Sequence, residues 1–405
     1  MDVTIEAIAS GGDGVARTGA DLVRAPFTLP GETVRVTPSG VEILTPSADR
    51  ITPACRHFGT CGGCALQHWA AGPMRAWKRS CVEQALARAG VEAAVSDTID
   101  AHGEGRRRAV LHARRRKGEL VLGFAERGAR EIVDIDRCPV LAAPLAAALP
   151  GLREIAAHFL HGQPAVDLWL TASDTGVDVA VRGFQRGGFR FSADRQAGAA
   201  ALAERLDLAR LSVGHEPLVV RRTPVVTMGR AQVRLPPGPF LQATKLGETT
   251  LARLVVAAGA GARRAYDLFA GLGAFALRLA ESMEVRAVEK EPGAAAALRQ
   301  GFEETPGLKK VVVEPRDLFV NPIGGKALAD IDLVVFDPPR AGAREQAKML
   351  AAGRTPRVVA VSCDAGTFAR DARILIDGGY QLHSVTPVDQ FRWSTHVEIV
   401  GVFDR

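Results

Sequence analysis

The sequence has no long run of apolar residues. No stretch of its 405 residues approaches the roughly 18 consecutive apolar residues that a membrane-spanning helix needs, so we expect no membrane association. The first residues lack the basic and then apolar pattern of a secretory signal peptide, which favours a cytoplasmic location. Internal repeats and long low-complexity tracts are also missing. We therefore expect two or three compact domains from a chain of this length.

Cysteine is scarce, with six residues in the whole chain. In a reducing cytoplasm these thiols are not expected to pair as disulfides, so clustered cysteines there indicate metal ligands or catalytic groups. The net charge of +6 and the pI of about 9.2 are mildly basic. This balance is compatible with a polyanionic partner such as a nucleic acid.

The first segment, residues 1–48, consists of short apolar pieces separated by glycine turns at 11–14, 18–19 and 30–31. Several short strands at this spacing are typical of a small β-barrel of the kind that binds oligonucleotides. A β-rich packing module without a ligand fits the same composition, and this segment alone does not separate the two.

A cluster of cysteines follows, made of Cys55, Cys61, Cys64 and, further along the chain, Cys138. Gly62 and Gly63 let the backbone turn tightly, as closely spaced ligands require. Four thiolates suit either a tetrahedral zinc ion or an iron–sulfur cluster, and the spacing leaves both open. Buried free cysteines are the alternative. Cys81 is expected on the apolar side of a helix over about 74–89, as part of the core.

Two basic runs, at 105–108 and 114–117, bracket a short predicted strand at 109–113. Together they could form a surface that contacts phosphates, although a solvated charged face is the usual explanation of such runs. Residues 140–230 mix alanine-rich helical segments with short strands and are expected to form a central α/β layer.

Beyond residue 240, apolar strands alternate with helical segments. The strands are expected near 264–269, 285–288, 311–313, 333–336 and 358–361, a pattern typical of a doubly wound parallel sheet. After the first strand, Gly271 and Gly273 form a turn that allows close approach of a cofactor, and Glu289 ends the next strand, where a carboxylate typically binds ribose hydroxyls. A dinucleotide-binding dehydrogenase fits this turn equally well.

The next strand end favours a methyltransferase. Asp337 is followed by two prolines and then Arg340, which places a rigid loop over the cofactor crevice. An aromatic residue after the prolines is usual in enzymes that methylate amino groups, so Arg340 argues against a nitrogen target. Cys363 at a later strand end and Glu398 near the end of the sequence then suggest a thiol nucleophile and a carboxylate base.

With these residues the chain resembles, over nearly its whole length, the RNA uracil-C5 methyltransferases, and more specifically the bacterial 23S rRNA branch that carries a TRAM domain and a four-iron–four-sulfur cluster. The resemblance implies an α/β protein in three parts. Residues 1–48 correspond to an OB-like TRAM β-barrel, 49–235 to a central α/β domain with the cluster and an RNA-contacting surface, and 236–405 to a Rossmann-like class I methyltransferase domain.

The resemblance also implies the site residues. Cys363 matches the nucleophile that adds to uracil C6, and Glu398 matches the general base. The family's [4Fe-4S] ligands correspond to Cys55, Cys61, Cys64 and Cys138. Its S-adenosylmethionine-binding positions correspond to Gln242, Phe269, Glu289, Asp317 and Asp337, with Asp317 the loosest match. The implied partner is 23S rRNA before full ribosome assembly, bound by a monomer.

Three departures from the family pattern stand near the site. Ala274 replaces the usual Asn after the second glycine, Asp364 and Ala365 replace an Asn-Pro pair, and Ala270 replaces a Cys. None removes a catalytic group. The alternatives are uracil-C5 methylation of tRNA, whose enzymes usually lack the TRAM domain and the cluster, and a non-catalytic iron–sulfur protein that binds RNA.

Overall fold

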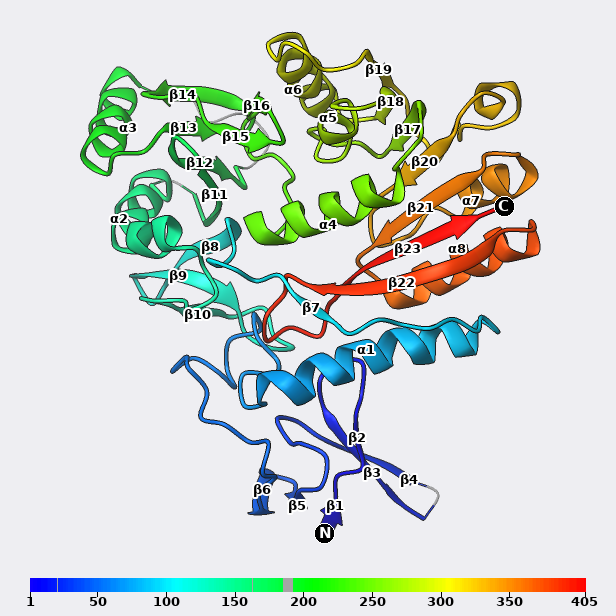
Figure 1. Cartoon of the computed structure of the whole chain (residues 1–405). Helices are drawn as coiled ribbons and strands as arrows, with labels where there is room; N and C mark the ends of the chain where they lie inside the picture. Colours follow the sequence, from blue (N-terminus) through cyan, green and yellow to red (C-terminus); the bar gives the residue numbers. More distant parts are fainter. Residues whose placement is uncertain (20, 162, 185–191) are drawn as a thin grey trace.

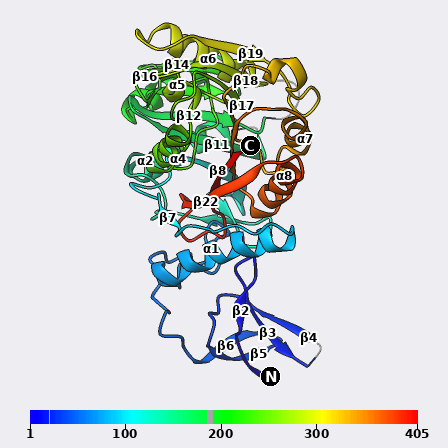
Figure 2. The same cartoon turned by 45° about the vertical axis from the view of Figure 1, so that its right-hand side comes forward.

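The computed structural model describes residues 1–405 except 20, 162 and 185–191. Its elements form a small β-rich module at the N-terminus and two larger sheets with their helices (Figure 1). The N-terminal module lies at one end of the molecule, beyond helix α1 (Ala71–Arg88), and the turned view of Figure 2 shows the same separation. No helix among the described residues is long and apolar enough to span a bilayer.

The N-terminal module contains two antiparallel sheets of three strands each. One holds β1 (Asp2–Thr4), β5 (Thr33–Thr37) and β6 (Gly40–Thr45). The other holds β2 (Ala7–Ile8), β3 (Gly14–Thr18) and β4 (Asp21–Ala25). Val3, Ile5 and Val34 are buried between them. The strands predicted from the glycine turns are therefore present, while their assignment as a TRAM barrel stays a prediction.

The middle of the chain forms a sheet of seven strands in the order β10-β9-β8-β11-β12-β13-β14. The bounds are β8 (Arg108–Arg116), β9 (Glu119–Ala125), β10 (Ile132–Asp134), β11 (Ala165–Ser173), β12 (Gly176–Arg182), β13 (Arg210–Val213) and β14 (Glu216–Val220). Helices α2 (Ala143–Phe159) and α3 (Ala193–Arg205) pack on it. A hairpin of β15 (Val225–Met228) and β16 (Ala231–Arg234) leads to the last sheet.

The third sheet has eight strands in the order β19-β18-β17-β20-β21-β23-β22-β7. The bounds are β7 (Ile99–Asp100), β17 (Arg264–Leu268), β18 (Glu284–Glu289), β19 (Val311–Pro315), β20 (Leu333–Phe336), β21 (Arg357–Ser362), β22 (Gln381–Asp389) and β23 (Glu398–Asp404). Its helices are α4 (Lys245–Ala258), α5 (Ala276–Leu279), α6 (Pro292–Glu303), α7 (Arg344–Ala352) and α8 (Ala365–Asp377). A 3-10 turn, η1, spans Gly325–Leu328.

The topology of this sheet places the site. Strands β17 to β21 are parallel, and all four residues of β20 are buried, as expected for a strand covered on both faces. Strand β23 runs antiparallel to both β21 and β22 and lies between them. Its first residue therefore lies at the edge where the parallel strands end.

One connection was not indicated by the sequence. Strand β7 comes before the seven-stranded sheet in the chain, yet it extends the eight-stranded sheet by pairing in parallel with the end of β22. Helix α1, predicted from its apolar spacing, packs on α8 in the same part of the molecule. The segment at 71–100 thus belongs in space with the C-terminal sheet. The division of the chain at residues 48 and 235 stays a prediction.

Candidate active site

The strand register brings Cys363 and Glu398 to the same point. Ser362, the last residue of β21, pairs with Ile399 of β23, so Cys363 and Glu398 continue that ladder as neighbours. Cys363 is half-buried, and Glu398 is buried with only 3% of its surface exposed. The two chemistry-bearing residues singled out by the sequence analysis, 35 positions apart in the chain, thus lie side by side at the carboxyl ends of the parallel strands.

Two carboxyl groups and two amides meet at this edge. The Gln242 side-chain amide donates to the Asp337 carboxyl at 2.9 Å. The Gln390 side-chain amide donates to the side-chain oxygen Oε1 of Gln242 at 2.6 Å and to Glu398 Oε1 at 3.1 Å. Glu398 Oε2 is buried and has no hydrogen-bond partner among the described residues. The site therefore offers an unpaired acceptor beside amides held in fixed orientations.

Burial is the main cause of the raised pKa values of the acidic side chains in this site. Burial first, and then the nearby Asp337 carboxyl, raise the pKa of Glu398 to about 8. Burial likewise raises the pKa of Asp337 to about 7, against the hydrogen bond from Gln242. The pKa of the Cys363 thiol rises to about 11, first through burial and then through the charges of Glu398 and Asp337. In the ligand-free protein at neutral pH the thiol is protonated.

Arg340 supplies positive charge at the mouth of the site. Its charge lowers the pKa of Cys363 and of Glu398, and its guanidinium lies 2.5 Å from His396 Nε2. Burial and this guanidinium lower the pKa of His396 to about 4, so the ring is neutral and can accept the hydrogen bond. His396 is thus a partner that holds Arg340, and the sequence analysis assigned it no chemistry.

The glycine turn after β17 has the backbone shape that a cofactor site requires. Gly271 and Gly273 have φ angles of +55° and +94°, and Phe269 adopts +63°, an uncommon value for a non-glycine residue. A Cβ on Gly273 would lie 2.9 Å from Leu298 Cγ. The Gly271 amide donates to Glu289 Oε2 at 2.8 Å, so the carboxylate predicted to bind ribose now holds the turn.

Asp317 lies at the next strand end. It forms an ion pair with Lys290 at 2.6 Å, which lowers the pKa of its carboxyl. Its Oδ1 accepts from the amide of Phe319, whose exposed ring packs against Phe269 at a centroid distance of 5.5 Å. Asp317 and Phe269 therefore border one region at the carboxyl ends of the strands. A role for either residue in adenosine binding stays a prediction.

The four predicted metal ligands come from two segments of the chain. Cys55, Cys61, Cys64 and Cys138 are all free and half-buried. Burial raises the pKa of Cys64 to about 12, and the other three thiols raise it further, which places the four within electrostatic reach of one another. However, the described residues contain no group of three or more His, Cys, Asp or Glu side chains arranged to hold a metal ion. The donor set has the right chemistry, but the structure does not show the cluster.

The chain has relatives that decide its family. No family model matches it. An uncharacterized RNA methyltransferase of Caulobacter vibrioides is 47% identical, with 100% of both chains covered. The 23S rRNA (uracil(1939)-C(5))-methyltransferase RlmD of Halomonas elongata is 33% identical over 98% of this chain and 88% of its own. The chain belongs to the RNA uracil-C5 methyltransferase family.

A solved structure supports the fold of this methyltransferase. The Pyrococcus abyssi tRNA (uracil-54, C5)-methyltransferase, determined in complex with S-adenosyl-L-homocysteine, matches with a TM-score of 0.75, 22% identity and 100% coverage of both chains. The C-terminal sheet thus has the class I methyltransferase fold that the family resemblance implied. Because the relatives are RNA methyltransferases, the dehydrogenase alternative is wrong.

Sequence reasoning missed two contributors to the methyltransferase site. Gln390 orients both Gln242 and Glu398, and it is fully buried in the segment between β22 and β23. Arg107, part of the first basic run, is buried as well, and its Nε donates to the backbone carbonyl of Gln242 at 3.1 Å. A charge run gave no signal that one member faces inward, and a lone glutamine carries no motif.

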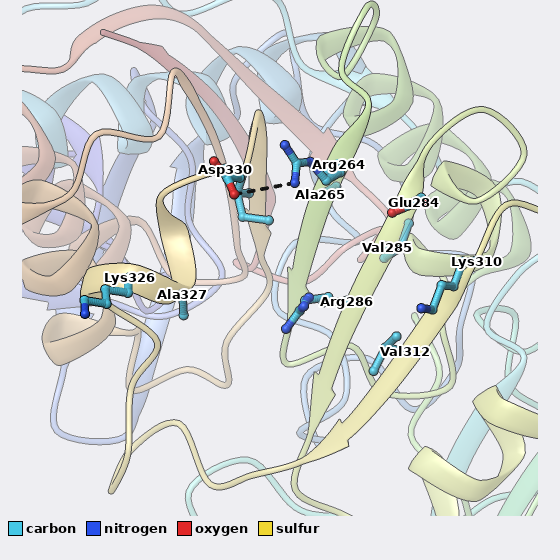
Figure 3. A pocket seen from close by; sticks show the side chains of 11 residues that line it. Arg264, Ala265, Glu284, Val285, Arg286, Lys310, Val312, Lys326, Ala327 and Asp330 are labelled. Carbon is cyan, nitrogen blue, oxygen red and sulfur yellow. Dashed lines mark ion pairs between the residues drawn. The ribbon is translucent and has the colours of Figure 1, made fainter.

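A basic cavity lies elsewhere on the same sheet. A cavity of about 460 Å³ is lined by Arg264, Arg286, Lys310 and Lys326 among others (Figure 3). Arg264 begins β17, Arg286 lies in the first half of β18, Lys310 directly precedes β19 and Lys326 lies on η1. Because class I methyltransferases bind their ligands at the carboxyl ends of the strands, this cavity is not part of the active site.

Proposed function

We propose that the protein transfers a methyl group from S-adenosylmethionine to C5 of a uridine in 23S rRNA, through a covalent adduct of Cys363. The observation that carries this proposal is the placement of the Cys363 thiol beside the unpaired Glu398 carboxyl, with Gln242 and Asp337 next to them. Uracil C5 is a weak nucleophile, so a thiol within reach of C6 and a base within reach of C5 are what this reaction requires.

The steps follow from these groups. Cys363 loses its proton and its sulfur bonds to uracil C6, which moves the electrons of the C5–C6 double bond toward C5 and O4. Bound S-adenosylmethionine supplies the methyl group that C5 attacks. The Glu398 carboxylate then takes the C5 proton, the double bond re-forms and the C6–S bond breaks, which frees Cys363.

The remaining residues position the base. The Gln242 and Asp337 side chains offer donors and acceptors that orient the uracil and the cofactor, and Arg340 offsets negative charge as it develops near the thiol. These groups lie in a recess at the sheet edge, so the target nucleotide must be single-stranded or turned out of its helix to reach them.

We expect activity to rise with pH. The reactive forms of Cys363 and Glu398 are both deprotonated, and both pKa values lie above their ordinary range. Because two protons must be lost, the value of kcat/KM should increase about a hundredfold per pH unit below pH 8 and about tenfold per unit above it. Replacing Asp337 with Asn removes a charge that raises the pKa of Glu398. The rising limb of the pH profile of this variant should therefore move to lower pH. Steady-state profiles from pH 6 to 9 check this. A flat profile would contradict the assignment of these groups.

The choice of 23S rRNA rests on the relative from Halomonas elongata and on the cysteine set, which the tRNA branch usually lacks. The test is transfer of a labelled methyl group to unmodified 23S rRNA fragments and, in parallel, to unmodified tRNA, followed by digestion and mass spectrometry for 5-methyluridine. Label in tRNA alone would overturn the ribosomal substrate while keeping the chemistry. A deletion strain would then identify the uridine that loses its methyl group.

We further propose that the N-terminal sheets form a TRAM module and that Cys55, Cys61, Cys64 and Cys138 hold a [4Fe-4S] cluster. The four thiols suit such a cluster in kind, and the Cys61–Cys64 loop has a tight fit: Gly62 donates to the Ala125 carbonyl at 2.9 Å, and a Cβ there would lie 3.0 Å from that oxygen. When bound, the cluster would tie this loop to the segment carrying Cys138.

Replacing Cys61 with Ser should therefore impair folding or RNA binding before it impairs chemistry. We expect anaerobically purified Cys61→Ser protein to contain less than half the iron and sulfide of wild type, to melt at lower temperature and to bind RNA about tenfold more weakly. Cys81→Ser is the matched control, because Cys81 lies on α1 apart from the four thiols. A stable, iron-free Cys61→Ser protein with full RNA affinity would contradict this role.

A further inference from the structure

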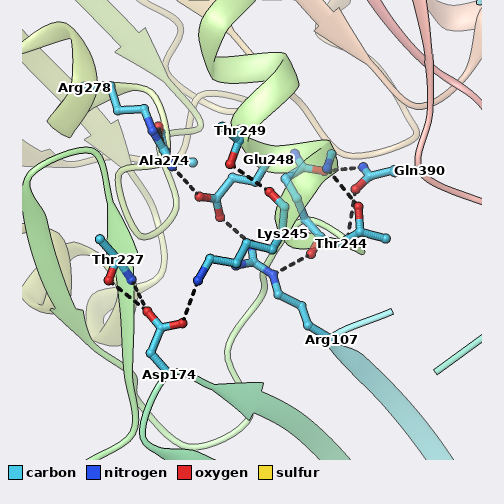
Figure 4. A network of polar contacts seen from close by, with 12 residues as sticks. Arg107, Asp174, Thr227, Thr244, Lys245, Glu248, Thr249, Ala274, Arg278 and Gln390 are labelled. Carbon is cyan, nitrogen blue, oxygen red and sulfur yellow. Dashed lines mark hydrogen bonds and ion pairs between the residues drawn. The ribbon is translucent and has the colours of Figure 1, made fainter. Parts of the chain in front are cut away.

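A buried carboxylate links the two halves of the active site. Glu248, in the first turn of α4, is only 2% exposed, and its two oxygens face guanidinium groups from different parts of the chain (Figure 4). Arg107, at the start of the seven-stranded sheet, donates to Oε2, and Arg278 of α5 donates to Oε1 at 2.9 Å. Buried charges of this kind are tolerated only when they are paired, so the three groups form one unit.

The outer ends of this unit reach opposite sides of the site. Arg107 Nε donates to the backbone carbonyl of Gln242 at 3.1 Å, and its backbone amide donates to the Ala243 carbonyl at 2.9 Å. Arg278 Nη1 donates to the carbonyl of Ala274, in the glycine turn, at 2.6 Å. One end therefore holds the segment that carries Gln242, and the other holds the glycine turn.

The turn depends on this hold. Ala274 has no polar side chain, so the turn's anchor at this position is its backbone carbonyl. That carbonyl accepts a hydrogen bond from Arg278, and Arg278 is oriented by Glu248. A change at Arg107 therefore reaches the cofactor turn through Glu248, although Arg107 itself does not contact the turn.

We propose that Glu248 is a positioning residue that couples the glycine turn to the Gln242 segment through Arg107 and Arg278. Binding of S-adenosylmethionine orders the glycine turn. Through Arg278, this also fixes the positions of Glu248, Arg107 and the Gln242 segment. By linkage, RNA that engages Gln242 tightens cofactor binding to the same degree. The coupling to RNA rests on the proposed function, whereas the hold on the cofactor turn does not.

Three charge-conserving or isosteric variants test the unit: Arg107→Lys, Arg278→Lys and Glu248→Gln. A lysine cannot make two hydrogen bonds in the fork geometry of arginine, so each arginine variant should break one link without removing a charge. We expect each variant to weaken binding of S-adenosylhomocysteine, measured by calorimetry without RNA, by about tenfold. The KM for S-adenosylmethionine should rise in parallel, while kcat at saturation should change by less than about threefold.

Arg107→Lys breaks the link on the side of Gln242 and should weaken cofactor binding, and the decisive result is how this change combines with Arg278→Lys. Its effect and that of Arg278→Lys should be non-additive in the double variant. With a 23S rRNA fragment present, the gain in affinity for S-adenosylhomocysteine seen in wild type should be lost in Glu248→Gln.

Arg357→Lys is the matched control. Arg357 makes a two-pronged ion pair with Asp404 and donates to the Ala258 carbonyl at 2.7 Å. It begins β21, at the end of the parallel strands opposite the site. We expect it to lower the melting temperature without changing S-adenosylhomocysteine affinity. If Arg107→Lys and Arg278→Lys behave like this control, the unit is merely structural and the proposal is wrong. If the protein binds S-adenosylhomocysteine but methylates no RNA, the proposed function fails, and the cofactor affinities still decide the role of Glu248.

Discussion

Replacing Cys363 with Ala should abolish both turnover and covalent capture of RNA. With 5-fluorouridine in the target RNA, the wild-type protein is expected to stall as a complex that survives denaturation, because fluorine at C5 cannot leave as a proton. The variant lacks the sulfur that bonds to C6, so it should form no such complex. Removing a nucleophile of this kind lowers the rate by at least about 10⁴-fold. Gel mobility after denaturation and label transfer measure the two effects.

Cys81→Ala is the control for this experiment, since Cys81 is also a free, half-buried thiol but lies on α1. It should retain both the complex and the activity. A complex that persists in Cys363→Ala would identify another nucleophile. If wild-type protein binds RNA but forms no covalent complex with either rRNA or tRNA, the result contradicts the covalent mechanism and supports the non-catalytic interpretation.

Replacing Glu398 with Gln should have the opposite effect on the complex. Glutamine fills the same space and can still accept the hydrogen bond from Gln390, but it cannot take the C5 proton. Methyl transfer should therefore proceed and release should fail, so a denaturation-resistant complex should accumulate on ordinary RNA, without fluorine. We expect turnover to fall by about 10²- to 10⁴-fold.

Mass spectrometry of the trapped complex would give the mass of protein, RNA and one methyl group. Glu345→Gln, an exposed change on α7, is the control and should behave as wild type. Normal turnover by Glu398→Gln would show that another group takes the proton. A complex that lacks the added methyl group would show that Glu398 acts before methyl transfer rather than after it.

The methyltransferase sheet was predictable because its signals are local. Each buried parallel strand is a short apolar run, and the chemistry-bearing residues follow such runs directly, as Asp337 follows β20 and Cys363 follows β21. The proximity of Glu398 was predictable only through the family resemblance. Its physical cause is the antiparallel register of β23 against β21, which no local pattern specifies.

The parts that could not be predicted depend on long-range contacts. The pairing of β7 with β22 joins residues almost 290 positions apart in sequence, and two residues of strand carry too little pattern to indicate it. The inward direction of Arg107 is set by Glu248, a partner 141 positions away. The second basic run was predicted to follow the strand at 109–113. Most of it instead belongs to that strand, because β8 continues through Arg116.

The position of β23 in the sheet bears on how the protein is made. Because β23 comes last among the strands and inserts between β21 and β22, a nascent chain that ends before Glu398 leaves the facing edges of both strands open, each with unpaired backbone groups. The carboxyl that we propose as the base and the strand that closes the sheet then arrive together during translation. Chains interrupted late in synthesis should therefore be captured by chaperones or proteases, instead of accumulating as folded proteins that bind RNA and cannot release it.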